Sequence, residues 1–321
     1  MIQDKLEILE RGKIIDHVLT DLASLGNQYG HSNYFKYALD ENITFFKSCR
    51  SLFQYLKWLF LRAPVIDREK ILELTDFPLP RWDQRMHLRL IELQARKFPG
   101  LIKPLVDKIS HFIYSADAEN PLVLMNFGSG GMEVERQVIE HLLSNRIKTP
   151  VIFIGVDTSD ATKIIAKENL KIFGDAILIK EEENIDQDYL ESLLKNVDIK
   201  PTIILCKNNI FTLLKVFRRE TVHLIYHSLF KHHLSNSEKR DLDIVSEFLS
   251  KNSIEYDGYK SWFHIVFSHT IMGWHDPVFL NATILSDLRY FTKRELRQHV
   301  QRDRKLRFFA IGTYMLEHRR T

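Results

Sequence analysis

The pattern of apolar residues changes near residue 115 of this 321-residue chain. Before that point apolar residues recur three and four positions apart, as in Ile14, Val18 and Leu22, which is the spacing of one helix face. Prolines divide this first region into several short helices. Beyond residue 121, short apolar runs alternate with helical patterns. The pattern therefore predicts an all-helical part followed by a part that contains both strands and helices.

A short polar segment separates the two parts. Residues 115–121 read Ser-Ala-Asp-Ala-Glu-Asn-Pro, and small, polar, proline-terminated sequences are typical of domain boundaries. We expect a helical N-terminal domain over residues 1–118 and a second domain over residues 119–321.

Seven apolar runs in the second part are candidate strands. Helical segments of ten or more residues separate most of them, which favours a parallel sheet covered by helices on both faces. The expected fold class is α/β, Rossmann-like, with a mainly parallel sheet of the seven-stranded type. The candidate strands are residues 122–126, 151–156, 176–180, 202–206, 222–227, 262–268 and 307–316.

The first candidate strand ends in a glycine-rich turn, Gly128-Ser129-Gly130-Gly131, and a helical pattern follows at once. Glycine allows a positive φ and a close approach of ligand to backbone, and the helix start offers free N–H groups. The second apolar run ends at Asp157. Strand, glycine loop, helix, strand and acid form the layout of a nucleotide-type pocket, in which the acid binds ribose hydroxyls. Two alternatives stay open: the glycines serve only packing, and Asp157 caps a helix that begins near Ser159.

The sixth position of the loop distinguishes between ligands. Dinucleotide-binding loops have a glycine there, whereas this chain has Glu133. A carboxylate would repel a pyrophosphate, so the loop favours a ligand without phosphates. A nicotinamide-dependent dehydrogenase is accordingly the weaker alternative.

The glycine loop resembles the first motif of class I S-adenosylmethionine-dependent methyltransferases, and Asp157 matches the ribose-binding acid of that family. Asn208-Asn209-Ile210-Phe211 resembles the turn after the family's third strand, whose acid meets the adenine amino group. Residues 223–234, which include a His-His-Leu sequence, resemble the fourth-strand segment of the branch that contains quinone C-methyltransferases. The motifs occur in order within residues 120–316. The resemblance implies S-adenosyl-L-methionine as cofactor and methyl transfer to a small molecule, driven mainly by proximity and orientation.

The residues that the resemblance assigns to the cofactor include three departures from the family pattern. Asn126 replaces the usual acid, Met132 the third glycine, and Asn209 the adenine-binding acid. These departures keep a second hypothesis open, a catalytically degenerate protein that binds or scaffolds. The expected cofactor-binding residues are Asn126, Gly128, Ser129, Gly130, Gly131, Asp157, Thr158, Asn208, Asn209 and His227.

The numbering of the strands has two solutions. Simple counting makes 176–180 the third strand and 222–227 the fifth. The motifs make 202–206 the third and 222–227 the fourth, with 176–180 as part of an insertion, and they leave the sheet one strand short at its end. We favour the second solution because the two motifs agree with each other.

Histidines are the candidate catalytic residues, namely His227 and His233. Adjacent residues of a helix point about 100° apart, so His232 and His233 are poorly placed to share a metal. No Cys or acid lies at ligand spacing, and we expect no metal. A packing or helix-capping role for His232 and His233 is the alternative to catalysis.

Composition and charge limit the expected partners. A net charge of +3 does not indicate nucleic acid, and the basic segment 289–307 lacks the interleaved aromatic residues of RNA-binding surfaces. Two cysteines and the lack of a signal-like N-terminus fit a cytoplasmic protein. The aromatic helix over residues 45–62 is expected to cover the substrate site, with Trp262 and Trp274 as further candidates for this cover, or to form a homodimer. Contact with a membrane surface is a less favoured interpretation of the same helix.

Overall fold

The computed structural model describes residues 100–116, 120–147, 149–195, 200–261, 286, 289–300, 304–310 and 312–319. The expected aromatic helix over residues 45–62, the candidate strand 262–268, Trp262 and Trp274 lie outside these described residues. So does the N-terminal domain up to residue 99.

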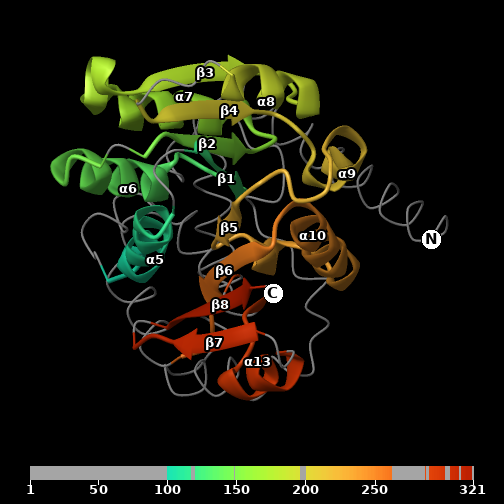
Figure 1. Ribbon diagram of the computed structural model, residues 1–321. Helices are drawn as coiled ribbons and strands as arrows, with labels where there is room; N and C mark the ends of the chain where they lie inside the picture. Colours follow the sequence, from blue (N-terminus) through green and yellow to red (C-terminus); the bar gives the residue numbers. More distant parts are fainter. Residues whose placement is uncertain are drawn as a thin grey trace, which may run out of the picture.

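The described elements form one mixed α/β layer structure (Figure 1). The strands are β1 (Leu122–Phe127), β2 (Val151–Val156), β3 (Leu178–Glu182), β4 (Thr202–Cys206), β5 (Leu224–Ser228), β6 (Asn252–Gly258), β7 (Arg304–Phe308) and β8 (Thr313–Arg319). The α-helices are α5 (Lys103–Tyr114), α6 (Glu133–Ser144), α7 (Asp160–Leu170), α8 (Gln187–Leu194), α9 (Leu213–Val216), α10 (Asn236–Leu249) and α13 (Lys293–His299). Three short 3-10 helices are η3 (Lys171–Ala176), η4 (Ile210–Thr212) and η5 (Lys231–His233).

The eight strands form one sheet in the order β3-β4-β2-β1-β5-β6-β8-β7. All pairs from β3 to β6 are parallel, whereas β8 is antiparallel to both of its neighbours. β1 and β2 are buried along their whole length, which is why they read as continuous apolar runs. The expected mainly parallel α/β sheet is confirmed.

Helices cover both faces of the sheet. Leu124 of β1 packs in one apolar cluster with residues of α5, α6 and α7, whereas Val123 packs in a second cluster with residues of α8 and α10. Because successive strand residues point to opposite faces, the two clusters lie on opposite sides of the sheet. α5 precedes the boundary that we expected near residue 118, yet its Leu105, Ile109 and Ile113 are fully buried in the first cluster.

In chain order, 178–182 forms the third strand and 224–228 the fifth, as simple counting expects, and the segment taken as part of an insertion pairs with β4 within the sheet. β3 lies at the edge beyond β4, and without it the remaining seven strands run β4-β2-β1-β5-β6-β8-β7. The apolar pattern did not reveal β6, which lies between β5 and β8. Its Ile254 and Tyr256 alternate with Glu255 and Asp257, and all four side chains are buried.

The single strand expected over 307–316 is wrong. β7 ends at Phe308, β8 begins at Thr313, and the two pair as an antiparallel hairpin. The turn between them is closed by the Gly312 N–H, which donates to the Phe309 carbonyl at 3.2 Å. Gly312 has a φ of 90°, which few other residues adopt. Phe308 at the end of β7 and Phe309 in the turn made this segment read as one apolar strand.

Candidate functional site

The glycine loop turns sharply at the carboxyl end of β1. Gly128 and Gly130 both have positive φ, 64° and 52°. The Gly128 N–H donates to the Val156 carbonyl at 2.9 Å, which folds the loop over the end of β2. A Cβ atom on Gly128 would lie 2.3 Å from Cδ2 of Phe230. Both the backbone angle and the close approach therefore require glycine at position 128.

The departure at Met132 has a packing explanation. Met132 has a φ of 59° as the N-cap of α6, and its side chain is fully buried. A Cβ atom on Gly155 of β2 would lie 2.6 Å from the Met132 sulfur. The Met132 side chain thus fills the space that Gly155 leaves open beside β2. The Met132 backbone keeps the left-handed conformation that the family's glycine would adopt at this position.

Asp157 connects the ends of β1 and β2. Its Oδ2 accepts from the Gly130 N–H at 3.1 Å, and its Oδ1 accepts from the Ser159 N–H at 2.9 Å. Burial raises the pKa of this carboxyl, and the two N–H donors oppose that shift. Ser159, which accepts from the Ala161 N–H, is the cap of α7. The alternative that Asp157 itself caps this helix is therefore wrong.

Asn126 is paired with an acid that the motifs did not reveal. Its Nδ2 donates to Oε1 of Glu135 on α6 at 2.6 Å, and the Tyr226 hydroxyl donates to the same oxygen at 2.5 Å. All three side chains are buried, and burial raises the pKa of Glu135. A carboxyl group thus lies beside residue 126, but it comes from the next helix. The only sequence signal is the polar character of Glu135 on an otherwise apolar helix face.

The asparagines after β4 have different roles. Asn208 is buried, and its side chain exchanges two hydrogen bonds with the backbone of Ile185, 2.8 and 3.1 Å long. Asn209 is exposed and caps η4 by accepting from the Phe211 N–H. Thr158 is also exposed. Of these, Asn209 and Thr158 keep surface that a ligand can reach, whereas the side chain of Asn208 holds the segment before α8.

Four of the expected site residues lie at the carboxyl ends of neighbouring strands. Gly128, Asp157 and Asn209 follow β1, β2 and β4, His227 lies near the end of β5, and these four strands are parallel neighbours. Parallel sheets bind ligands at this edge. The structure thus brings the residues together, as the motif order predicted.

The histidines lie on the β5 and β6 side of this edge. His227 is 5% exposed, its Nδ1 has no hydrogen-bond partner among the described residues, and burial lowers its pKa. His232 is buried, and its Nδ1 lies 2.8 Å from Oδ1 of Asp257, whose other oxygen accepts from the His232 N–H. The rings of His232 and His233 stack with centroids 4.1 Å apart, so they do not diverge as in an α-helix. The structural role expected for His232 agrees with its pairing to Asp257, which lies 25 residues away.

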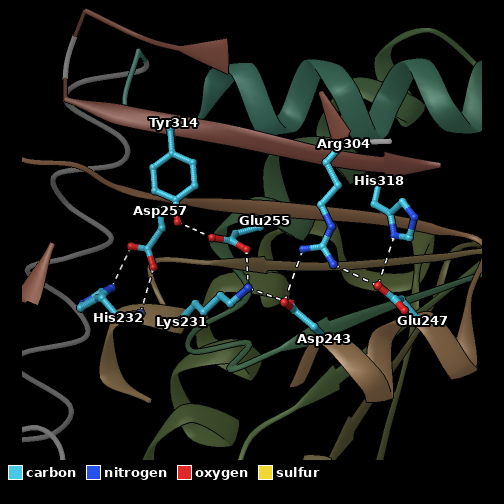
Figure 2. A network of polar contacts seen from close by, with 9 residues as sticks. All are labelled: Lys231, His232, Asp243, Glu247, Glu255, Asp257, Arg304, Tyr314 and His318. Carbon is cyan, nitrogen blue, oxygen red and sulfur yellow. Dashed lines mark hydrogen bonds and ion pairs between the residues drawn. The ribbon is translucent and has the colours of Figure 1, made fainter. Parts of the chain in front are cut away.

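A buried ionic network holds η5 against the sheet (Figure 2). The ammonium of Lys231 lies 2.7 Å from both Oδ1 of Asp243 on α10 and Oε2 of Glu255 on β6. The Tyr314 hydroxyl on β8 donates to Oε1 of Glu255, and Arg304 on β7 binds Asp243 from the other side. The network joins the antiparallel hairpin to the segment that carries His232.

Glu133 is less repulsive to anions than its sequence position indicated. Its carboxylate forms a two-point ion pair with Arg136 on the same helix, with N–O distances of 2.7 and 2.8 Å. The pair offsets the negative charge at the start of α6. Glu133 therefore disfavours a phosphate-containing ligand less than we expected.

A cavity lies away from the glycine loop. It has a volume of 530 Å³ and lies between α5 and the β7–β8 hairpin, and no residue of the glycine loop lines it. No helix among the described residues is long and apolar enough to cross a membrane.

No protein-family model and no curated protein matches this chain. Among solved structures, the plantazolicin methyltransferase BpumL in complex with SAH is similar at 11% identity and a TM-score of 0.48, covering 81% of this chain and 99% of that one. The CurJ carbon methyltransferase is similar at 14% identity and a TM-score of 0.43, covering 94% and 70%. Magnesium protoporphyrin IX methyltransferase from Synechocystis PCC 6803 with bound SAH gives 11% identity and a TM-score of 0.39, covering 68% and 83%. These likenesses are distant, so function must be inferred from the residues of this chain.

Proposed function

We propose that this protein is an S-adenosylmethionine-dependent methyltransferase that acts on a small molecule. The observation that carries the proposal is the direct hydrogen bond between Asp157 and Gly130, because it places an acid beside a glycine loop at adjacent strand ends. A carboxylate has about four lone-pair sites, so Asp157 can keep its two backbone donors and still accept from ribose hydroxyls. The sequence order of the motifs agrees with this placement.

The residues around the loop divide into two groups by their chemistry. The positive-φ glycines allow the cofactor to approach the backbone, and Asn209 and Thr158 offer polar surface beside Asp157. His227 and His233 lie toward β6, where an acceptor would lie, and His227 is a neutral base because burial lowers its pKa.

When bound, the cofactor supplies a methyl group already activated by its sulfonium. The chain's own task is to hold the acceptor in line and to exclude water. The small-molecule acceptor is proposed from the resemblance of residues 223–234 to the quinone C-methyltransferase branch. The N-terminal residues 1–99 are proposed as a lid or a dimer contact.

Calorimetry with S-adenosylhomocysteine (SAH) and, separately, with NAD tests the proposal. SAH should bind and raise the melting temperature by mass action, whereas NAD should give no heat. Asp157→Asn should weaken SAH binding about ten- to hundredfold, because it removes charge-assisted hydrogen bonds.

Thr292→Ala is the matched control, since it removes the capping acceptor of α13 beside the far edge of the sheet and should leave SAH affinity unchanged. Heat with NAD alone would indicate a dehydrogenase. The absence of heat with both ligands would indicate a binding or scaffold protein.

A further inference from the structure

We propose that Phe230 gates the cofactor site, its ring and the cofactor competing for the same space over Gly128. This inference rests on the proposed function, because it assigns the ligand at the glycine loop to the cofactor. It gives a role to Phe230, which lies within residues 223–234 but to which the resemblance assigns none.

The position of the ring is the first observation. Three ring atoms of Phe230 lie within 2.9 Å of where a Cβ on Gly128 would be, so the ring covers the face of the loop that glycine leaves open. Gly128 and Phe230 come from the carboxyl ends of neighbouring strands, β1 and β5. A ligand that uses the close approach at Gly128 meets this ring first.

The backbone that carries the ring is the second observation. Leu229 has a φ of 51°, a left-handed conformation that a bulky residue rarely adopts. Its N–H is held by the Tyr256 carbonyl at 2.8 Å, and the Phe230 carbonyl accepts from the His233 N–H at 3.0 Å. Strained, well-anchored turns of this kind are found at switches and ligand clamps. Turning Phe230 away would let Leu229 return to an ordinary backbone conformation.

The residue beside the ring is the third observation. The rings of Phe230 and His227 meet edge to face with centroids 6.3 Å apart, and Nδ1 of His227 is buried with no partner in the part of the chain that the structure describes. Movement of Phe230 would therefore uncover the imidazole that we place on the acceptor side. Cofactor entry and access to His227 would occur together.

Calorimetry with SAH on single variants of the full chain separates a gate from simple packing. Phe230→Ala removes the competing ring, so it should bind SAH about tenfold more tightly if the open form is about a tenth of the molecules. Leu229→Gly should bind more weakly than the wild type, because glycine relieves the strain of the closed turn. Phe217→Ala is the matched control: Phe217 is buried in the apolar cluster against which Phe230 packs, and its loss should lower the melting temperature without tightening SAH binding.

The outcomes assign failure to one proposal or the other. Tighter SAH binding by Phe230→Ala together with weaker SAH binding by Leu229→Gly supports the gate. Binding of SAH to Phe230→Ala but not to the wild type also supports it. If the wild type binds SAH and folded Phe230→Ala binds no more tightly, the gate is wrong and the proposed function stands. If SAH binds neither protein, both are wrong.

Discussion

At the scale of single residues, the carboxyl of Glu135 sets the charge beneath the glycine loop. Within the described part of the chain, its Oε2 and Oδ1 of Asn126 are both buried without a partner. Burial raises the pKa of Glu135 and outweighs the opposing hydrogen bonds from Tyr226 and Asn126. A protonated Glu135 can donate to Asn126, which an ionised one cannot. We therefore expect the neutral acid at this site.

Glu135→Gln should stabilise the protein at neutral pH by about 1–3 kcal/mol, since the amide donates to Asn126 without needing a proton. A raised folded-state pKa means that the contribution of Glu135 is fully present below pH 4.5 and is lost as pH rises through the folded pKa. The extra free energy of unfolding of Glu135→Gln over the wild type should therefore grow as pH rises above 4.5, and urea unfolding measures it.

Glu140→Gln, on an exposed residue of the same helix, should change stability by less than about 0.5 kcal/mol at every pH. A Glu135→Gln variant less stable than the wild type at about pH 8, where the ionised form is most favoured, would show that the ionised form is the native one.

At the scale of elements, Lys231 joins η5, α10 and β6. Its ammonium neutralises Asp243 and Glu255, and the Lys231 charge, helped by Arg304, keeps the pKa of Asp243 low although burial opposes this. Lys231→Met should cost about 3 kcal/mol at neutral pH, because two partly buried carboxylates lose their shared cation. Because the pKa of Asp243 is lowered in the folded state, this carboxylate contributes stability that is present above pH 3.8 and lost as pH falls. Lys231→Met lacks this contribution, so its stability should fall less on acidification than that of the wild type.

Lys103→Met provides the comparison in the same urea unfolding series. Lys103 pairs with Asp107 on the surface of α5, where both side chains are more than half exposed, and its replacement should cost less than about 1 kcal/mol. Equal losses for the two variants would contradict a structural role for the buried network.

At the scale of the whole molecule, α5 belongs to the core of the sheet domain. Its buried leucine and isoleucines pack on β1 and α6, and the Tyr256 hydroxyl donates to the Leu101 carbonyl at 2.5 Å. A truncation at the expected boundary would remove this helix. A truncated protein that tests the role of the N-terminal residues should therefore begin near residue 100.

Deletion of residues 1–99 should leave cooperative unfolding and measurable SAH affinity, whereas deletion of 1–115 should abolish folding, since it exposes the face that α5 covers. Circular dichroism melting and calorimetry check both variants, and light scattering reports whether residues 1–99 hold a dimer. A stable, SAH-binding deletion of 1–115 would contradict the role given to α5.

The sequence alone determined the features that depend on neighbouring residues. The apolar runs of β1 and β2, the glycine turn after β1 and the acid after β2 are local signals, and they located one edge of a mainly parallel sheet. Motif order treated 176–180 as part of an insertion, whereas 178–182 is β3 of the sheet. Tertiary structure decided what depends on distant partners. β6 escaped recognition because its buried Glu255 and Asp257 are paired with residues of other segments, namely Lys231, Tyr314 and His232.

The same division holds within the site. Glu135 meets Tyr226 across 91 positions of sequence, and Phe230 covers Gly128 from the next strand of the sheet. No periodicity links such pairs, because strand neighbours in a parallel sheet are joined by long crossovers. Local chemistry therefore specified the glycine loop and the acid beside it, whereas packing between remote segments placed Glu135 beside Asn126 and the ring of Phe230 over Gly128.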